Sequence, residues 1–249
     1  MQKRVTVTAG AYIVRSIACS IILALSAVAA IAPAAAQTVA CLDATSGTAQ
    51  GATATGIDTT ACGVAATASG DFSTATGGSA TASGASSTAI GQAATASGDF
   101  STANGEAATA SGASSTATGQ ASTASGDLST ATGEAATAGG TSSTASGQSA
   151  SASATSSTAI GQASVASGTN STAIGQGAQA TFDNSMALGQ GVTTSRLNQI
   201  AIGANVNTYT AAGITSAASS AAQGTVTGVI TTDADGNLAS DNGALQSQV

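Results

Sequence analysis

Large side chains are scarce in this sequence. The chain contains no histidine, no tryptophan and one proline, and aromatic residues make up only 2% of its 249 residues. Its 42% of hydrophobic residues is largely alanine. A globular core of interlocking large side chains is therefore not expected. Without histidine, a serine nucleophile would need lysine as its base, and the one lysine is Lys3, so an enzyme is not expected either.

The first residues have the layout of a signal peptide. Lys3 and Arg15 precede an apolar stretch, Ile17–Ala30, and small residues follow up to Ala36. Such an order predicts export, with cleavage near Ala36 removing residues 1–36. A permanent membrane anchor is the alternative, but the apolar stretch is shorter than the roughly 20 residues that a spanning helix needs.

Basic residues are almost absent beyond this leader. Arg196 alone remains, against eleven carboxylates. Nucleic-acid binding depends on clusters of lysine and arginine that neutralise phosphates, so no nucleic-acid partner is expected. Attraction to an anionic membrane surface is disfavoured for the same reason.

Cysteine is rare as well. Cys19 lies in the leader, which leaves Cys41 and Cys62 as an even pair in an oxidising compartment. We expect a disulfide between them that holds the N-terminal end of the repeat; two free or intermolecular thiols are the alternative. Two thiols without imidazole make a tetrahedral zinc site improbable, and no metal or cofactor is expected.

A strict 14-residue period is what the chain does have. The triplet Ala-x-Gly recurs in phase, and its glycines are residues 63, 77, 91, 105, 119, 133, 147, 161, 175, 189 and 203. A second register lies seven residues away, with glycines at 56, 70, 84, 98, 112, 126, 140 and 168, interrupted by Ala154 and followed by Phe182. A period this regular indicates a repeat structure and not disorder.

Each half of the 14-residue unit predicts a short strand followed by a turn. Small and β-branched residues alternate for a few positions before each glycine, whereas glycine at every seventh position disfavours a helix. Strands this short must stack on copies of themselves. We therefore predict an all-β parallel solenoid of about eleven coils, one per 14 residues, roughly 50 Å long.

The residue before glycine distinguishes the two halves. In one half this residue is often large and apolar, and in the other it is usually serine. The large residues are Ile90, Ile160, Ile174, Leu188 and Ile202. An outward column of this kind favours a homo-oligomer that buries it. Alternatively, the column fills the coil interior, because a period of two does not say which face points inward. The N-terminal coils place Thr76, Asn104, Thr118, Thr132 and Ser146 in this column, and we expect them to associate less tightly.

The segments Ser87–Gly98 and Ser171–Gly175 resemble the head repeat of YadA-like trimeric autotransporter adhesins, over residues 47–207. The resemblance implies a left-handed parallel β-roll, a homotrimer, and exposure on a Gram-negative surface, where the head binds host or environmental surfaces. Residues 37–46 form a lead-in, and residues 208–249 are a Gly/Ser/Thr-rich extension in which we expect a β-hairpin and the start of a stalk.

Such adhesins end in a stalk and a membrane anchor that contributes strands to a trimeric barrel, and no such strands follow the repeat before Val249. We therefore expect a membrane partner only through an anchor that this sequence lacks. A truncated reading frame, a secreted head and one piece of a larger assembly stay open as explanations.

Two patterns of acidic residues are best interpreted as turns. Asp233-Ala-Asp-Gly-Asn237 looks like the start of a calcium loop, but the twelfth position is Ala244 in place of the bidentate glutamate, so a turn is expected. Asp71, Asp99 and Asp127 lie 28 residues apart, as do Glu106 and Glu134, which indicates a double repeat of solvated turns.

Adhesion through a repetitive outer face is thus the predicted function, with avidity adding to weak single contacts. The extracellular surface or matrix ligand is not specified by the sequence. Binding to ice or another crystal surface is the alternative, suggested by the regular Thr-x-Ser segments 81–83, 95–97 and 123–125.

Overall fold

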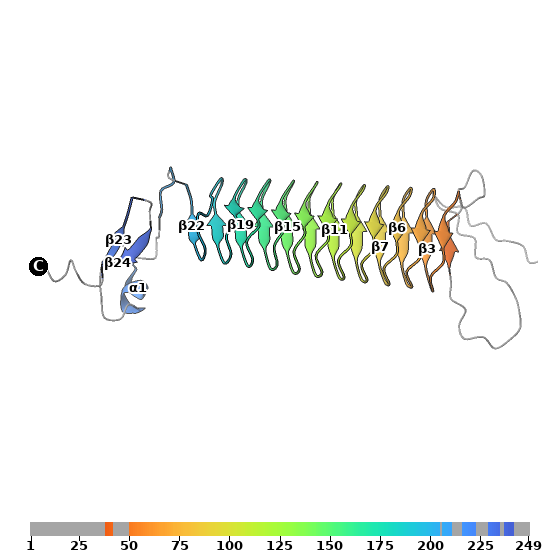
Figure 1. The fold of residues 1–249 in the computed structure, drawn as a ribbon, viewed down its shortest axis with the longest axis horizontal. Coiled ribbons are helices and arrows are strands. Elements are labelled where there is room, and N and C mark those ends of the chain that lie inside the picture. The colour runs from red at the N-terminus through yellow and green to blue at the C-terminus, as the bar shows by residue number, and fades with distance from the viewer. Residues whose placement is uncertain are drawn as a thin grey trace, which may run out of the picture. The chain divides into compact units, whose positions relative to one another are not determined.

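The computed structural model describes residues 38–41, 50–204, 206–210, 216–222, 229–234 and 237–241. The predicted signal peptide, with Cys19, lies outside these residues. The chain divides into two compact units, Met1–Asn205 and Val206–Val249. The first unit contains the 14-residue repeats and the second contains a short helix and a hairpin (Figure 1).

Two parallel sheets form the first unit. The 12-stranded sheet has the order β1-β3-β5-β7-β9-β11-β13-β15-β17-β19-β21-β22. Its strands are β1 (Val39–Ala40), β3 (Thr60–Cys62), β5 (Thr74–Thr76), β7 (Thr88–Ile90), β9 (Thr102–Asn104), β11 (Thr116–Thr118), β13 (Thr130–Thr132), β15 (Thr144–Ser146), β17 (Thr158–Ile160), β19 (Thr172–Ile174), β21 (Met186–Leu188) and β22 (Ile200–Ile202).

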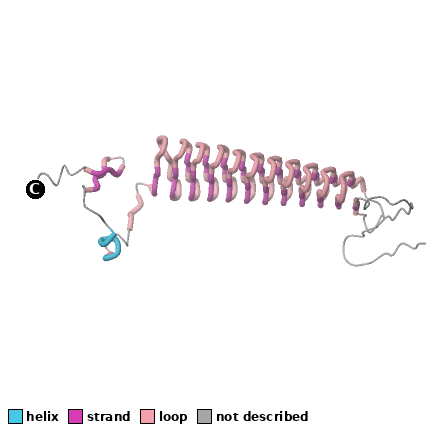
Figure 2. The backbone as a smooth tube through the Cα atoms, turned by 90° about the horizontal axis from the view of Figure 1, so that it is seen from below, coloured by secondary structure: helices cyan, strands magenta, loops and turns pink. Residues whose placement is uncertain are grey.

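The even-numbered strands form the 10-stranded sheet, again in sequence order. These strands are β2 (Thr53–Ala54), β4 (Thr67–Ala68), β6 (Thr81–Ala82), β8 (Thr95–Ala96), β10 (Thr109–Ala110), β12 (Thr123–Ala124), β14 (Thr137–Ala138), β16 (Ser151–Ala152), β18 (Val165–Ala166) and β20 (Gln179–Ala180). The chain alternates between the two sheets along the whole unit, as the tube in Figure 2 shows.

Strand pairing follows the sequence period. Ala75 pairs with Ala89 and Ala82 with Ala96, so each residue lies beside the residue 14 positions further on. This register confirms the prediction of an all-β parallel solenoid with about eleven coils. Neighbouring coils are about 4.8 Å apart, the spacing of hydrogen-bonded strands.

The second unit is small. It contains the helix α1 (Ala217–Ala222) and the antiparallel pair of β23 (Ile230–Thr232) and β24 (Leu238–Ser240). The backbone N–H of Asn237 donates to Asp233 Oδ1 at 2.9 Å, and its side-chain amide donates to Oδ2 at 2.7 Å. Asp233 therefore closes the turn between the two strands.

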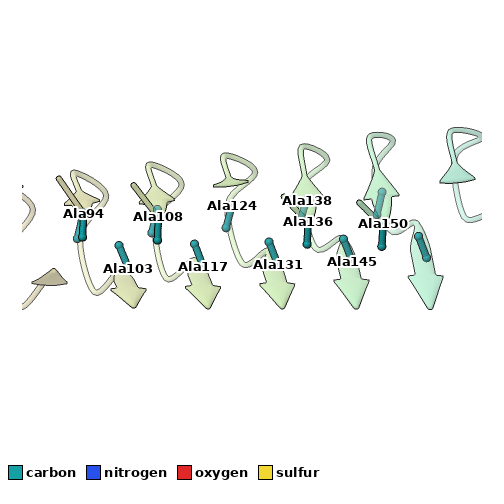
Figure 3. Close-up of a cluster of buried hydrophobic side chains, with 14 of the residues drawn as sticks. Ala94, Ala103, Ala108, Ala117, Ala124, Ala131, Ala136, Ala138, Ala145 and Ala150 are labelled. Atoms are coloured by element: carbon teal, nitrogen blue, oxygen red, sulfur yellow. The ribbon is translucent and has the colours of Figure 1, made fainter. Parts of the chain in front are cut away.

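Alanine fills the interior of the solenoid. Ala103, Ala117 and Ala131 from the 12-stranded sheet face Ala94 and Ala108, which lie directly before strands of the opposite sheet, and all are fully buried (Figure 3). Among the described residues, the largest buried apolar side chain of this interior is that of Val192. The interpretation that the isoleucine column fills the coil interior is therefore wrong, since alanine occupies the inward positions and the isoleucines point outward.

Glycine allows the coils to approach each other at the turns. A Cβ atom added to Gly112 would lie 2.1 Å from the carbonyl oxygen of Gly126, and one added to Gly119 would lie 2.6 Å from that of Gly133. Gly119 also has φ +126, which L-residues rarely adopt. The 14-residue recurrence of glycine thus follows from the contact between stacked turns.

The described core of the repeat also contains buried polar side chains. Most of them belong to one column of serines, and the others are Thr59, Ser122, Ser164 and Thr194. Seven hydroxyls of this column are buried without a hydrogen-bond partner: those of Ser73, Ser87, Ser101, Ser115, Ser129, Ser143 and Ser171. By contrast, Ser157 Oγ donates to the carbonyl oxygen of Ala154 at 2.6 Å. Equivalent positions therefore differ in whether their hydroxyl is satisfied.

We expect Ser129→Ala to stabilise the solenoid by about 1 kcal/mol, because alanine removes a buried hydroxyl that has no partner. The matched variant Ser157→Ala should destabilise it by about 1 kcal/mol, because it deletes a hydrogen bond. Thermal melting followed by circular dichroism measures both. Equal shifts in the melting temperatures of the two variants would contradict this assignment.

Candidate functional site

The candidate functional sites in the described part of the chain are surfaces, because no metal centre is found there. No group of three or more Cys, Asp or Glu side chains in residues 38–41, 50–204 and the described C-terminal segments is placed to hold a metal ion. Within the same residues, no helix has the length and hydrophobicity needed to cross a membrane. The candidate sites are therefore the two sheet faces and the turns between them.

The outer face of the 12-stranded sheet carries the predicted isoleucine column. Ile90 and Ile160 are 42% exposed, and Ile202 is 52% exposed. Ile160 pairs with Ile174, and Leu188 pairs with Ile202, so these four form a continuous apolar row from β17 to β22. Ile90 lies apart from this row.

Ile90 has polar neighbours, since it pairs with Thr76 on one side and Asn104 on the other. The structure therefore divides the predicted column into a C-terminal apolar row and one isolated residue. Sequence reasoning missed two apolar residues in the column beside this row. Met186 and Ile200 pair with each other two residues before Leu188 and Ile202, in positions where the earlier coils have threonine.

The outer face of the 10-stranded sheet is polar and uncharged. Thr81, Thr95 and Thr123 are partly exposed, and Ser83, Ser97 and Ser125 are exposed. The register of β6, β8, β10 and β12 aligns the threonines in a single column. Hydroxyl groups therefore recur on this face at the coil spacing of about 4.8 Å.

The turns that follow the 12-stranded sheet carry a ladder of amides and carboxylates. Gln120 Nε2 donates to Glu106 Oε2 at 3.4 Å, and Gln148 Nε2 donates to Glu134 Oε2 at 3.2 Å. The ladder continues through glutamines 14 residues apart, with Gln162 donating to Gln148 at 2.9 Å. These side chains connect successive coils along one edge of the solenoid.

Carboxylates on the opposite turns bind backbone. Asp71, Asp99 and Asp127 each accept the N–H of the residue 14 positions earlier, at 2.8, 2.9 and 2.9 Å. The 28-residue spacing of these aspartates thus places one fixed carboxylate on every second coil.

Cys41 and Cys62 meet at the N-terminal end of the unit. Their sulfur atoms are bonded, and their Cα atoms lie 4.7 Å apart, beside the pairing of β1 with β3. The bond spans 21 residues of sequence.

The repeat itself carries the comparison with known proteins. The family model of the YadA head domain repeat matches residues 54–80, 82–105, 117–143, 138–164 and 166–191. This chain belongs to the YadA head-domain family. Its repeats are therefore an adhesin-type β-roll, and the resemblance predicted from the sequence is confirmed. The heads of such adhesins are surface-exposed, and the family is in general non-enzymatic.

Among solved structures, the collagen-binding domain of the Yersinia adhesin YadA is similar to this YadA-type head. The two are 23% identical, with a TM-score of 0.34, and the match covers 80% of this chain and 87% of that one. No curated protein matches the chain.

We expect the Cys41–Cys62 disulfide to form in the oxidised protein and to stabilise the first coils of the YadA-type head. Closing a loop of this length is worth about 3 kcal/mol in the chain-entropy description. Mass spectrometry of the alkylated protein, with and without reductant, tests the pairing. Alkylation of both cysteines without reductant would contradict it. The variant Cys41→Ser with Cys62→Ser should lower the melting temperature.

Proposed function

We propose that this chain is the head of an exported cell-surface adhesin that attaches to surfaces or to host or matrix components as a homotrimer. The observation that carries the proposal is membership of the YadA head-domain family, combined with outer faces that repeat the same groups at every coil. A repeated face makes many weak contacts at once, and avidity then supplies the strength of attachment. Catalysis has no part in this proposal.

The apolar row at the C-terminal end of the solenoid supports the assembly of three copies. Ile160, Ile174, Leu188 and Ile202 are exposed or partly exposed in one copy, and Ile90 lies apart at the same position of an N-terminal coil. Three copies around a shared axis would bury these side chains against each other. The row is dense only from β17 onward, so the N-terminal coils are held together less tightly.

Export supplies the cellular setting. We propose that residues 1–36 are a cleaved signal peptide, that residues 47–207 are the head, and that residues 208–249 lead toward a stalk. The layout of charged, apolar and small residues supports the leader. The head would then act at the cell surface, at the outer membrane or in the extracellular space.

The polar face favours a second candidate, binding to ice or to another crystal surface. Thr81, Thr95 and Thr123 are aligned by the strand register on a face without charged residues. Serine occupies the second column, which offers no methyl group. Thermal hysteresis of concentrated protein separates this candidate from adhesion, because an adhesin without ice affinity produces none.

The assembly predicts that Ile160→Thr with Ile174→Thr weakens association by about 2 kcal/mol or more for each subunit, because each change removes buried apolar surface. Threonine occupies the same position in other coils, so the fold should persist. Multi-angle light scattering over a concentration series measures the mass. Ile90→Thr is the control and should have little effect, because Ile90 has polar neighbours. A wild-type chain that stays monomeric would refute the trimer.

Attachment is tested with beads that carry the purified chain, on surfaces coated with collagen or other matrix proteins and on bare glass. We expect the wild-type chain to be retained under flow well above background on at least one of these surfaces, because many copies on one bead contact the surface at once. Beads that carry albumin give the background. Retention of the wild-type chain no higher than albumin on every surface would argue against an adhesin.

A further inference from the structure

Three large apolar side chains lie exposed on the turns that follow the 10-stranded sheet. Phe72, Phe100 and Leu128 are 60%, 66% and 63% exposed. They are 28 residues apart, so they occupy every second coil, and the coils between them have Ser86 and Ser114 at the same place. Together with Asp71, Asp99 and Asp127, which precede them, we call these residues the turn row.

The backbone at these positions is unfavourable for bulky residues. Phe72, Phe100 and Leu128 have φ of 60, 58 and 57°, in the left-handed region where side chains larger than asparagine are uncommon. Their N–H groups donate to the preceding coil, for example Phe100 to the carbonyl oxygen of Ala85 at 2.8 Å, and so the turns are held in place. Folding gains little from such exposed rings. Contact with another molecule accounts better for large apolar groups at these sites.

Charge specifies what that molecule carries. Each aspartate of the turn row is fixed by the N–H that it accepts from the preceding coil, and the apolar residue follows it directly in the chain. A lysine or arginine fits such a pair, because its charge meets the carboxylate while its methylene stem lies on the apolar side chain. At the two phenylalanines its cationic head can also lie on the ring. A second copy of this chain fits poorly, because its coils have Arg196 as their one basic residue and would bring further carboxylates.

Spacing specifies how the cations are arranged. Two coils at about 4.8 Å place successive members of the turn row about 9.6 Å apart. A polyproline II chain advances about 3.1 Å per residue, so every third side chain recurs on one face after about 9.3 Å. Side chains on one face of a β-strand recur after about 6.7 Å, which does not match. Seven residues of an α-helix advance about 10.5 Å, which drifts out of phase by the third member.

We propose that the turn row binds an extended, polyproline II chain that has a lysine or arginine at every third residue. Three cations would meet the pairs of Asp71 with Phe72, Asp99 with Phe100, and Asp127 with Leu128. The inference rests on the proposed adhesin function in that it names a class of ligand for the head. It places recognition on the N-terminal coils, where the apolar row of the 12-stranded sheet is lacking.

Binding of a fluorescent peptide of repeating Pro-Pro-Lys triplets to the full chain, followed by anisotropy, tests the proposal. We expect Phe72→Ser with Phe100→Ser and Leu128→Ser to weaken binding at least about tenfold, since three favourable contacts are lost. Serine is the natural residue of the intervening coils, so the fold should be kept. Asp71→Asn with Asp99→Asn and Asp127→Asn should weaken binding similarly, because asparagine keeps the acceptor and removes the charge.

A peptide of the same charge in which lysine alternates with proline is the spacing control, and it should bind at least about tenfold more weakly. Equal affinity of both peptides, or of the serine variant and the wild type, would reduce binding to non-specific charge attraction and overturn the proposal. A change of oligomeric mass in the serine variant, measured by light scattering, would overturn it in favour of contact between copies.

The outcome is separable from that of the adhesin proposal. Triplet-specific peptide binding without bead attachment would leave the turn row valid and refute adhesion. Attachment of beads in both the wild type and the serine variant, with no triplet-specific peptide binding, would support adhesion and refute the turn row as a binding site.

Discussion

Hydrogen bonding between coils at a fixed register is the constraint on which the structure depends. The N–H of Thr74 donates to the carbonyl oxygen of Ser87 at 2.9 Å, and that of Thr88 donates to Ser101 at 2.9 Å, and the pattern continues coil after coil. Because every coil lies at hydrogen-bonding distance from the next, turns must pass each other closely, and glycine occupies most of the positions where they do. The same closeness leaves an interior that alanine fills. A chain with few large side chains folds because its backbone bonds, and not a bulky core, define the stack.

Much of this was predictable from the sequence, because the 14-residue recurrence of Ala-x-Gly fixes the length of a coil. The direction of the isoleucines was not. Alternation places Ala89 and Ile90 on opposite faces but does not say which is inward, and both hydrophobic types are compatible with burial. The structure decides the matter, because alanine is buried at the inward positions whereas Ile90 and Ile160 are 42% exposed.

The turn row was only half visible in the sequence. The spacing of Asp71, Asp99 and Asp127 indicated a double repeat. A large apolar residue after each aspartate would ordinarily be expected to pack against the coil. Its exposure depends on the left-handed turn, which lifts Phe72 and Phe100 away from the coil. Sequence patterns report which residues recur, whereas the conformation of the turn determines whether a recurring side chain is covered. The missed residues beside the apolar row, Met186 and Ile200, show the same limit, because they replace the threonine of the earlier coils at positions that no repeat distinguishes.

The uniform register also has a consequence for how such a head changes in length. Each coil bonds to its neighbours in the same way, so the loss or gain of one 14-residue unit leaves all remaining pairings intact and changes the reach of the molecule by about 4.8 Å. The length of the head therefore changes in steps of one coil. The steps are not equivalent for the surface, however. Removal of two coils between Phe72 and Leu128 keeps the alternation of large apolar and serine turns, whereas removal of one coil brings two like turns together. Ligand spacing therefore restricts length changes to even numbers of coils, whereas folding allows any number.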